Sequence, residues 1–238
     1  MPRFCPLDIV PFVTLGLGFF TIAFSFYIWR EDESLQSVAF CGFESHENFF
    51  YKAFASKFSH LTYLHLSLNV LFLLDVGFNL EKQLGSFGFL FLYGIALLGI
   101  IGLGCLYHAF IFSGCSVGAS AVLFSIFTFW CYNCEGNLFF LGIVPSNPIY
   151  VPWLFLILCQ LFFWSSATGL HACGIVFGIF TYYIIPKSFW DALKCSSDVY
   201  HEPNSSDNLD NDYPSESVPI TSSGNNSFNY KTDQHNVV

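Results

Sequence analysis

The sequence predicts an all-α membrane protein built from six transmembrane helices. Hydrophobic residues make up 54% of the 238 residues, and only 11% are charged. Soluble domains carry about 25% charged residues. Apolar runs recur between residues 9 and 186, and many approach the roughly 20 residues that a helix needs to cross a bilayer.

The predicted spans divide the chain into three parts. A short N-terminal segment covers residues 1–8, the six-helix domain covers residues 9–186, and residues 187–238 form an acidic tail rich in Ser, Asn and Asp that we expect to be disordered. The spans are drawn at 9–29, 60–80, 86–107, 118–134, 151–167 and 168–186. The first span is too long for a typical signal-peptide core and reads as a retained signal anchor.

The connections between the spans carry their own signals. The first loop, residues 30–59, contains many aromatic residues, which suits a segment lying in the membrane interface. The fifth and sixth spans are separated only around 165–168, so their turn must be tight. Lys187 and Lys194 immediately follow the last span, and the positive-inside bias then places both termini in the cytosol.

Charge and cysteine content exclude several classes of function. The net charge of -9 argues against nucleic acid, because phosphate binding needs a basic patch. Cys131-x-x-Cys134 is a single pair, whereas a structural zinc site needs four ligands, and we expect no metal and no cofactor. Cys41 and Cys115 fall in loops on one side of the membrane and could pair if that side is oxidising.

Four polar residues stand at the same end of three predicted spans. His65 and Asn69 lie near the start of the second span, Ser120 opens the fourth, and His171 opens the sixth. If the N-terminus is cytosolic, these spans all begin at the lumenal face. Polar residues inside a membrane are costly and indicate function, so the sequence predicts a site in the lumenal half of the membrane.

The residue types predict serine protease chemistry. A serine hydroxyl is a weak nucleophile until a nearby base, usually histidine, takes its proton. No Asp or Glu stands near His171 in the sequence, so Ser120 and His171 are expected to act as a dyad. Backbone N–H groups of Ala119 and Ser120 at a helix start are free to donate to an oxyanion. His65 and Asn69, spaced i and i+4, share one helix face and could donate as well.

Glycines allow the two catalytic helices to approach each other. Gly174 and Gly178 form a Gly-x-x-x-Gly pattern after His171, and such patterns permit close packing in membranes. Each residue alone also has a structural reading. Ser120 after Gly118 could be a small packing residue with a hydroxyl bonded to its own helix, and His171 a polar contact between helices. Their coincidence with His65 and Asn69 favours the catalytic reading.

Several short motifs carry a resemblance to a known family. They are Gly118-Ala119-Ser120, His171-Ala172-Cys173-Gly174, His65-x-x-x-Asn69 and Gly77-x-x-x-Glu81-x-x-x-Gly85-Ser86. In order and spacing they resemble the rhomboid intramembrane serine proteases over about residues 48–186. The resemblance implies a six-helix rhomboid bundle.

The resemblance also implies a role for each residue of the cluster. Ser120 is then the nucleophile and His171 the base, while His65 and Asn69 stabilise the oxyanion. Phe124, one turn after Ser120, stands where rhomboids place an aromatic ring against the catalytic histidine. Single-span membrane proteins are the implied substrates, and the lipid bilayer is the surrounding partner.

Within the family, the chain looks most like the ER-resident animal branch that contains rhomboid-related protein 4. The Cys131-Tyr132-Asn133-Cys134 region and the loop at 141–145 carry that likeness. Ala121 follows the serine where many rhomboids have Gly, and Phe50 and Lys52 stand where the family has Trp and Arg in the first loop. The branch carries a ubiquitin-interacting stretch that residues 187–238 lack, so no ubiquitin binding is predicted.

The sequence therefore predicts an intramembrane serine endopeptidase that cleaves transmembrane proteins near the lumenal face. The branch likeness indicates the endoplasmic reticulum membrane, with other endomembranes and the plasma membrane left open. Substrates must unwind locally, because a helix hides its carbonyls in its own hydrogen bonds, and the fifth span is the expected gate.

The sequence leaves two other classes of function as alternatives. An inactive rhomboid-fold factor that binds membrane clients would typically lack the serine or the histidine, and this chain has both. A channel or transporter would carry polar residues near the midplane and internal repeats, whereas here the polar residues gather toward one leaflet.

Overall fold

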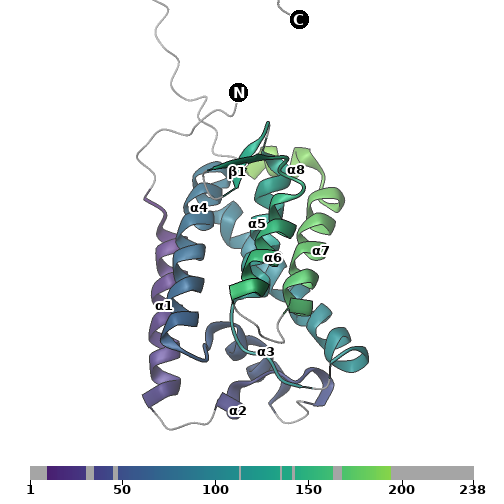
Figure 1. The fold of residues 1–238 in the computed structure, drawn as a ribbon. Helices are drawn as coiled ribbons and strands as arrows, with labels where there is room; N and C mark the ends of the chain where they lie inside the picture. The colour runs from purple at the N-terminus through teal and green to yellow at the C-terminus, as the bar shows by residue number, and fades with distance from the viewer. Residues whose placement is uncertain are drawn as a thin grey trace, which may run out of the picture. The chain divides into compact units, whose positions relative to one another are not determined.

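A computed structural model describes residues 10–30, 35–44, 48–112, 114–134, 136–140, 143–162 and 168–193. Its regular elements are helices, apart from one short hairpin and an isolated β-bridge between Phe40 and Ser116. The long helices run alternately up and down through the bundle (Figure 1). In chain order the elements are α1 (Phe12–Arg30), α2 (Leu35–Val38), the 3₁₀ turn η1 (Gly42–Glu44), α3 (Phe49–Phe58), α4 (Tyr63–Phe110), α5 (Ser120–Asn133), β1 (Leu138–Phe140), β2 (Val144–Ser146), α6 (Val151–Phe162), α7 (Thr168–Ile184) and α8 (Lys187–Leu193).

The longest helix, α4, is two helices joined at a break. Gly85 has φ 72° and ψ 165°, a conformation that glycine adopts without the penalty a side chain would bring. The arms at 63–84 and 86–110 therefore run in opposite directions, and the break falls between the second and third predicted spans. The chain reverses here within a single residue.

The described helices differ in length from the predicted spans. By length and composition, α1 and α4 are long and apolar enough to cross a membrane, whereas α5, α6 and α7 are apolar but shorter. They have 14, 12 and 17 residues, and at 1.5 Å per residue each is shorter than a bilayer core of about 30 Å. Six spans of full length are therefore not established by the structure.

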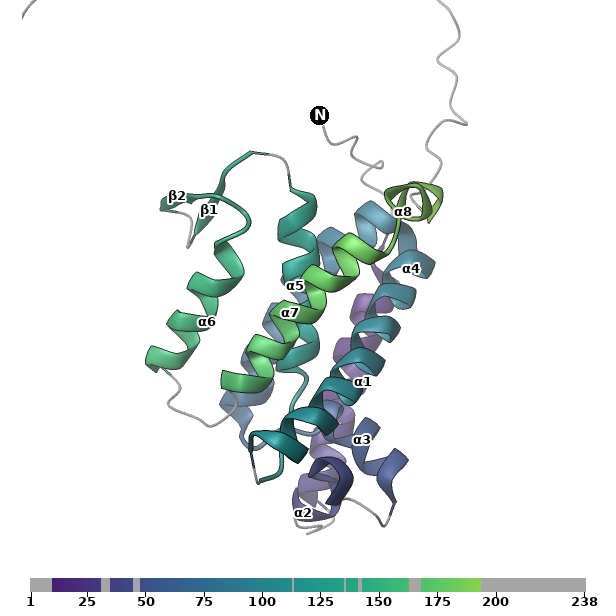
Figure 2. The ribbon, with the colours of Figure 1, turned by 90° about the vertical axis from the view of Figure 1, so that its right-hand side faces the viewer.

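Helix α5 forms the centre of the bundle. Every side chain from 121 to 129 is buried, and α5 packs most extensively against α7. Figure 2 shows α7 running across α5, with α6 at the edge of the bundle below the β1–β2 hairpin. A central helix that is apolar on all sides is the expected pattern for a buried helix.

Helix α1 turns its small residues toward the first arm of α4. Its buried residues recur every three or four positions, and most are small or carry a hydroxyl; they are Thr14, Gly18, Thr21, Ser25 and Ile28. Large apolar side chains such as Phe12, Phe19 and Phe26 lie on the opposite, exposed face. Small residues permit close helix approach in a membrane, so the outward aromatic face is the one suited to lipid.

A buried carboxylate joins the start of α1 to the break in α4. Glu81 is fully buried and accepts hydrogen bonds from Val13 N–H at 3.0 Å, Thr14 N–H at 2.8 Å and the Thr14 hydroxyl at 2.7 Å. The Ser86 hydroxyl donates to it at 2.6 Å. Glu81 thus satisfies N–H groups that have no partner within α1 and attracts the positive end of the helix dipole.

Two segments outside the predicted spans contain helices. Within the predicted first loop, α2, η1 and α3 are ordered, and α3 buries Ala53, Ser56 and Lys57 against the bundle. The start of the predicted tail forms α8, in which Trp190 is 4% exposed and packs against Phe129. The prediction of a disordered tail is wrong for Lys187–Leu193, because the packing of Trp190 on Phe129 stabilises a helix there although the sequence that follows is polar. The rest of the tail and residues 1–8 lie outside the described residues.

Candidate active site

The structure brings Ser120 and His171 into direct contact. Nε2 of His171 lies 2.6 Å from Oγ of Ser120, within hydrogen-bond distance. Ser120 is the first residue of α5, and His171 lies in the first turn of α7. Both side chains are half-buried. Two parallel helices that start at the same end of the bundle (Figure 1) therefore set the separation of the pair.

Two glycines fix how closely α5 and α7 approach. A Cβ at Gly174 would overlap the carbonyl oxygen of Ala121, and a Cβ at Gly178 would overlap the carbonyl oxygen of Ser125. These partners are backbone atoms, which cannot move aside as a flexible side chain would. The glycines predicted to allow close approach thus lie in the α5–α7 interface, immediately after His171.

An aromatic ring supports the imidazole. Phe124 stacks on His171 with ring centroids 4.8 Å apart and an interplanar angle of 25°. Phe124 is 2% exposed, so it presents a fixed surface to the imidazole. The ring stands where the family likeness implied it would.

Of the two side chains expected to stabilise an oxyanion, His65 lies against the turn before α5, and Asn69 is bonded to the backbone of His65. The His65 ring packs on Gly118, where a Cβ would come within 2.9 Å of His65 Cε1. Asn69 is 7% exposed, and its Nδ2 donates to the carbonyl of His65 at 2.8 Å, while its Oδ1 is buried without a hydrogen-bond partner. Neither side chain is hydrogen-bonded to Ser120.

The chain enters α5 through a constrained turn. Gly118 has φ +116°, a value that L side chains rarely adopt, and its N–H donates to the carbonyl of Ser56 at 2.7 Å. Ala119 is the N-cap of α5, without a side-chain cap. The N–H of Ser120 has no partner within its own helix, so it is free to donate to an oxyanion.

The pair has no acidic partner among the side chains that the structure describes. The two carboxylates described on α4 make no hydrogen bond to His171 among the described contacts. Glu81 bonds to α1 and to Ser86, and Asp75 is exposed on α4. The described residues also contain no group of three His, Cys, Asp or Glu that could hold a metal ion. The geometry is that of a Ser–His dyad.

Comparison with known proteins supplies the family. The family model of the rhomboid domain matches residues 47–188, more than half of the chain. The chain belongs to the rhomboid family. Rhomboid-like protein 15 of Arabidopsis thaliana is 25% identical over 167 residues, a match covering 62% of this chain and 41% of the relative. The chain thus spans about two fifths of that relative's length.

Aromatic residues close this rhomboid site on the α6 side. Phe155 of α6 packs against Phe72 of α4, Phe124 and Phe127, with centroid distances of 4.9, 5.6 and 5.6 Å. The Thr168 hydroxyl at the start of α7 donates to Oε1 of Gln160 near the end of α6. The remaining predicted turn residues at 165–167 lie outside the described residues. Helix α6 thus covers the ring that supports His171.

Sequence reasoning missed several residues around the rhomboid site. Ser56 contributes its backbone carbonyl to Gly118, and no residue-type signal reveals a backbone contact. His60 is fully buried, bonds to Ser25 through Nδ1 at 3.1 Å, and meets the His65 ring at 5.0 Å between centroids. The sequence around His60 gave no signal for this burial against His65.

The structure also joins Cys41 and Cys115 in a disulfide. The sequence left this pairing open, because spacing alone does not bring two loops together. The other described cysteines that are free are Cys105, Cys131, Cys134, Cys159 and Cys173.

Proposed function

We propose that this rhomboid is an intramembrane serine endopeptidase. The observation that carries the proposal is the 2.6 Å contact between Ser120 Oγ and His171 Nε2. A hydroxyl hydrogen-bonded to an imidazole is the arrangement in which histidine activates serine as a nucleophile. The ring of Phe124 and the glycines of α7 hold the two side chains at this separation.

The chemistry follows from the two side chains. Ser120 Oγ attacks the carbonyl carbon of the scissile peptide bond while its proton passes to Nε2 of His171. The carbonyl oxygen becomes an oxyanion, which the Ser120 N–H and the side chains of His65 and Asn69 stabilise as donors. His171 then gives the proton to the leaving amine as the peptide C–N bond breaks. Water hydrolyses the resulting acyl-enzyme with His171 again as base.

The substrates in this proposal are single-span membrane proteins. The arms of α4 together with α1, α5, α6 and α7 make the six spans, and the shorter helices leave the site end open to water. A substrate helix must unwind near the site to expose a carbonyl. We place its entry beside α6, whose contacts with the site are largely aromatic, and the site itself at the lumenal face with both termini in the cytosol. The endoplasmic reticulum membrane is the proposed location.

Labelling with a serine-directed fluorophosphonate tests the proposal. The purified wild-type protein in detergent should be labelled, and Ser120→Ala and His171→Ala should each abolish the label. Ser125→Ala is the matched control, because Ser125 lies in the same helix and is 2% exposed. It should label like the wild type.

Two outcomes would count against a protease. Labelling that survives in Ser120→Ala would assign the reactive hydroxyl to another residue. A folded wild-type protein that neither labels nor cleaves a single-span substrate, but captures one intact, would favour the client-binding alternative.

A further inference from the structure

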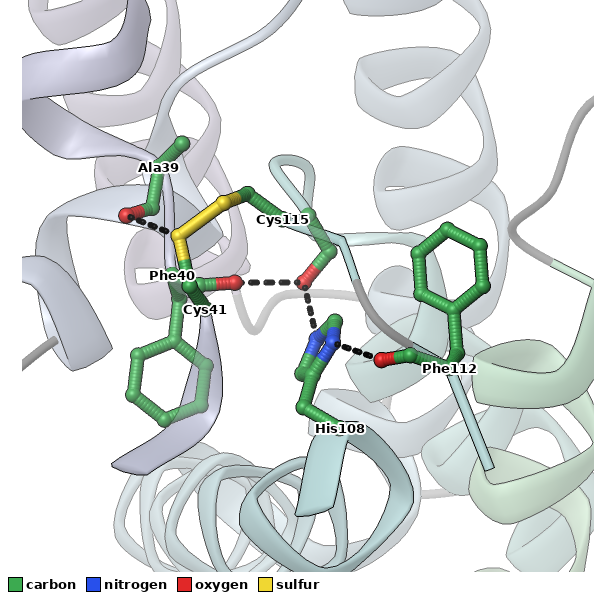
Figure 3. The surroundings of a disulfide bond; sticks show 7 residues. Ala39, Phe40, Cys41, His108, Phe112 and Cys115 are labelled. Carbon is green, nitrogen blue, oxygen red and sulfur yellow. Dashed lines mark hydrogen bonds between the residues drawn. A yellow bond between two sulfur atoms is a disulfide. The ribbon is translucent and has the colours of Figure 1, made fainter. Parts of the chain in front are cut away.

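The segment that leads into the nucleophile is tied to the first loop. Cys115 lies five residues before Ser120 in the sequence, and its disulfide to Cys41 spans a sequence separation of 74 residues. Figure 3 shows the bridge between the segment of Phe40 and Cys41 and the strand of chain that carries Cys115. The disulfide therefore links the first loop covalently to the segment just before Ser120.

Backbone hydrogen bonds reinforce the same connection. Phe40 N–H donates to the carbonyl of Ser116 at 3.0 Å, and Ser116 N–H donates to the carbonyl of Phe40 at 2.9 Å. Phe40 is completely buried, so its ring anchors this pair in the bundle. The disulfide joins Cys41, which follows Phe40, to Cys115, which precedes Ser116.

A histidine at the end of α4 lies inside the same cluster. Nε2 of His108 is 3.2 Å from the Ser116 hydroxyl, and Nδ1 is 3.4 Å from the carbonyl of Phe112. Figure 3 shows His108 between Phe40 and Phe112, beside the disulfide. His108 is 8% exposed. The disulfide, the Phe40–Ser116 pair and His108 thus form one unit, which we name the loop clamp.

The loop clamp continues to the nucleophile through Gly118. After Ser116, the next backbone bond runs from Gly118 N–H to the carbonyl of Ser56, and the His65 ring covers Gly118. Ser56 belongs to the first loop, and His65 lies in the first turn of α4, which follows that loop. The disulfide, the Phe40–Ser116 hydrogen bonds and the contacts of Gly118 thus all hold the segment 115–118. This segment leads directly into Ala119 and Ser120.

We propose that the Cys41–Cys115 disulfide is a positioning element of the protease, so that activity depends on an oxidising compartment. The inference rests on the proposed function. The bridge holds the turn at Gly118 so that the Ser120 N–H points to the developing oxyanion. A dithiol such as dithiothreitol reduces the bridge to two cysteine thiols and becomes a cyclic disulfide. The freed turn then loses the fixed donor, and oxyanion stabilisation depends on donors being held before the reaction.

A reductant titration tests the loop clamp. Full-length wild-type protein in detergent is assayed on a single-span substrate before and after reduction, with thiol alkylation and intact mass reporting the state of the bridge. Reduction should lower kcat at least tenfold and change KM less than twofold, since the lost interaction acts in the transition state. Reoxidation should restore kcat.

Cysteine variants separate this bridge from the other thiols. Cys41→Ser and Cys115→Ser should each show the low kcat of the reduced protein and no response to reductant. Cys105→Ser is the matched control, because Cys105 is a free, buried cysteine that packs with Phe40. It should be as active as the wild type and lose activity on reduction in the same way.

Three results would overturn the loop clamp. An unchanged kcat in the reduced wild type shows that the bridge does not position the donor. A reduced protein that has lost its cooperative thermal transition at the assay temperature assigns the bridge a purely structural role. Absence of both labelling and cleavage in the oxidised wild type refutes the proposed function, and the loop clamp with it. The first result, by contrast, leaves the proposed function intact and refutes the loop clamp alone.

Discussion

Two polar clusters at opposite ends of the bundle use buried polar groups in different ways. At one end, both oxygens of the fully buried Glu81 carboxylate accept hydrogen bonds, from α1 and from Ser86. At the other end, Ser120 and His171 share one hydrogen bond and stay half-buried. The Glu81 cluster therefore stabilises the fold, whereas the Ser120–His171 pair keeps its groups available for a reaction.

Among the described residues, two of the buried polar groups that lack a hydrogen-bond partner contact His65, and three others lie on Tyr93, Trp130 and Trp190. Asn69 Oδ1 is buried without a partner, and so is Nε2 of the neighbouring His60. An unsatisfied buried group costs about 1–3 kcal/mol, so the groups beside His65 lower the stability of the fold. Glu81 has no comparable deficit. Substitutions at the two ends should therefore separate activity from stability.

The largest expected effect is on catalysis at the dyad. Ser120→Ala and His171→Ala should each lower the rate of cleavage by about 10⁴-fold or more, because the nucleophile and its base act as one unit. The thermal midpoint should stay close to that of the wild type, since one shared hydrogen bond is lost. Cleavage of a fluorogenic single-span substrate and thermal unfolding in the same detergent measure the two effects. A large fall in the midpoint would show that the dyad also stabilises the fold.

The opposite cluster should show the reverse pattern. Glu81→Leu leaves the N–H groups of Val13 and Thr14 without their acceptor, and we expect a loss of about 2–4 kcal/mol in unfolding free energy. Glu81→Gln retains one acceptor oxygen and should lose less. Unfolding is followed in detergent by circular dichroism. Below the unfolding transition, kcat should match the wild type, and a kcat that falls without a loss of stability would contradict the division between the two ends.

The α5–α7 interface should couple the two properties. Gly174→Val forces side-chain atoms onto the backbone of Ala121, so we expect about 1–3 kcal/mol of destabilisation from overpacking and a lower kcat as the dyad separates. Gly94→Ala is the matched control, because a Cβ there meets nothing within 4 Å and alanine favours the helix. If both variants retained the wild-type stability and kcat, close approach of α5 and α7 would not set the dyad distance.

The sequence predicted the parts of this arrangement that depend on local pattern. Apolar runs located the helices, and the polar residues at their starts indicated that Ser120 and His171 would meet. The predicted ends differ from the observed ones by a few residues. The two arms of α4 reach residues 84 and 110, beyond the predicted ends at 80 and 107, whereas α5 is shorter than the span predicted at 118–134. The contact of Glu81 with Thr14 joins residues 67 positions apart, and the disulfide joins residues 74 apart. Such contacts depend on tertiary packing, which spacing in one sequence does not encode.

The smallest expected effect concerns a buried cation near the site end. Lys57 in α3 is 2% exposed, and its ammonium lies 5.3 Å from the centroid of the Phe40 ring. Burial lowers the pKa of Lys57 from 10.5 to about 8, against a smaller opposing effect of Cys105. The unfolded chain therefore binds more protons between pH 8 and 10.5, and stability should rise with pH across that window. Below pH 8 both states carry the charge, so the desolvation penalty is present in full at neutral pH.

Lys57→Met should remove this pH dependence while retaining most of the buried stem. We expect the variant to be about 1–2 kcal/mol more stable at pH 7, since the desolvation penalty is relieved while a cation–π contact of about 0.5–1 kcal/mol is lost. Thermal midpoints of wild type and variant between pH 7 and 10.5 measure the difference, with Lys52→Met on the same helix as control. A wild-type midpoint that does not rise across this window would mean that Lys57 remains hydrated. The Lys57 ammonium would then need no partner within the protein, unlike the Glu81 carboxylate. The difference between the two ends of the bundle would in that case depend on the Ser120–His171 dyad alone.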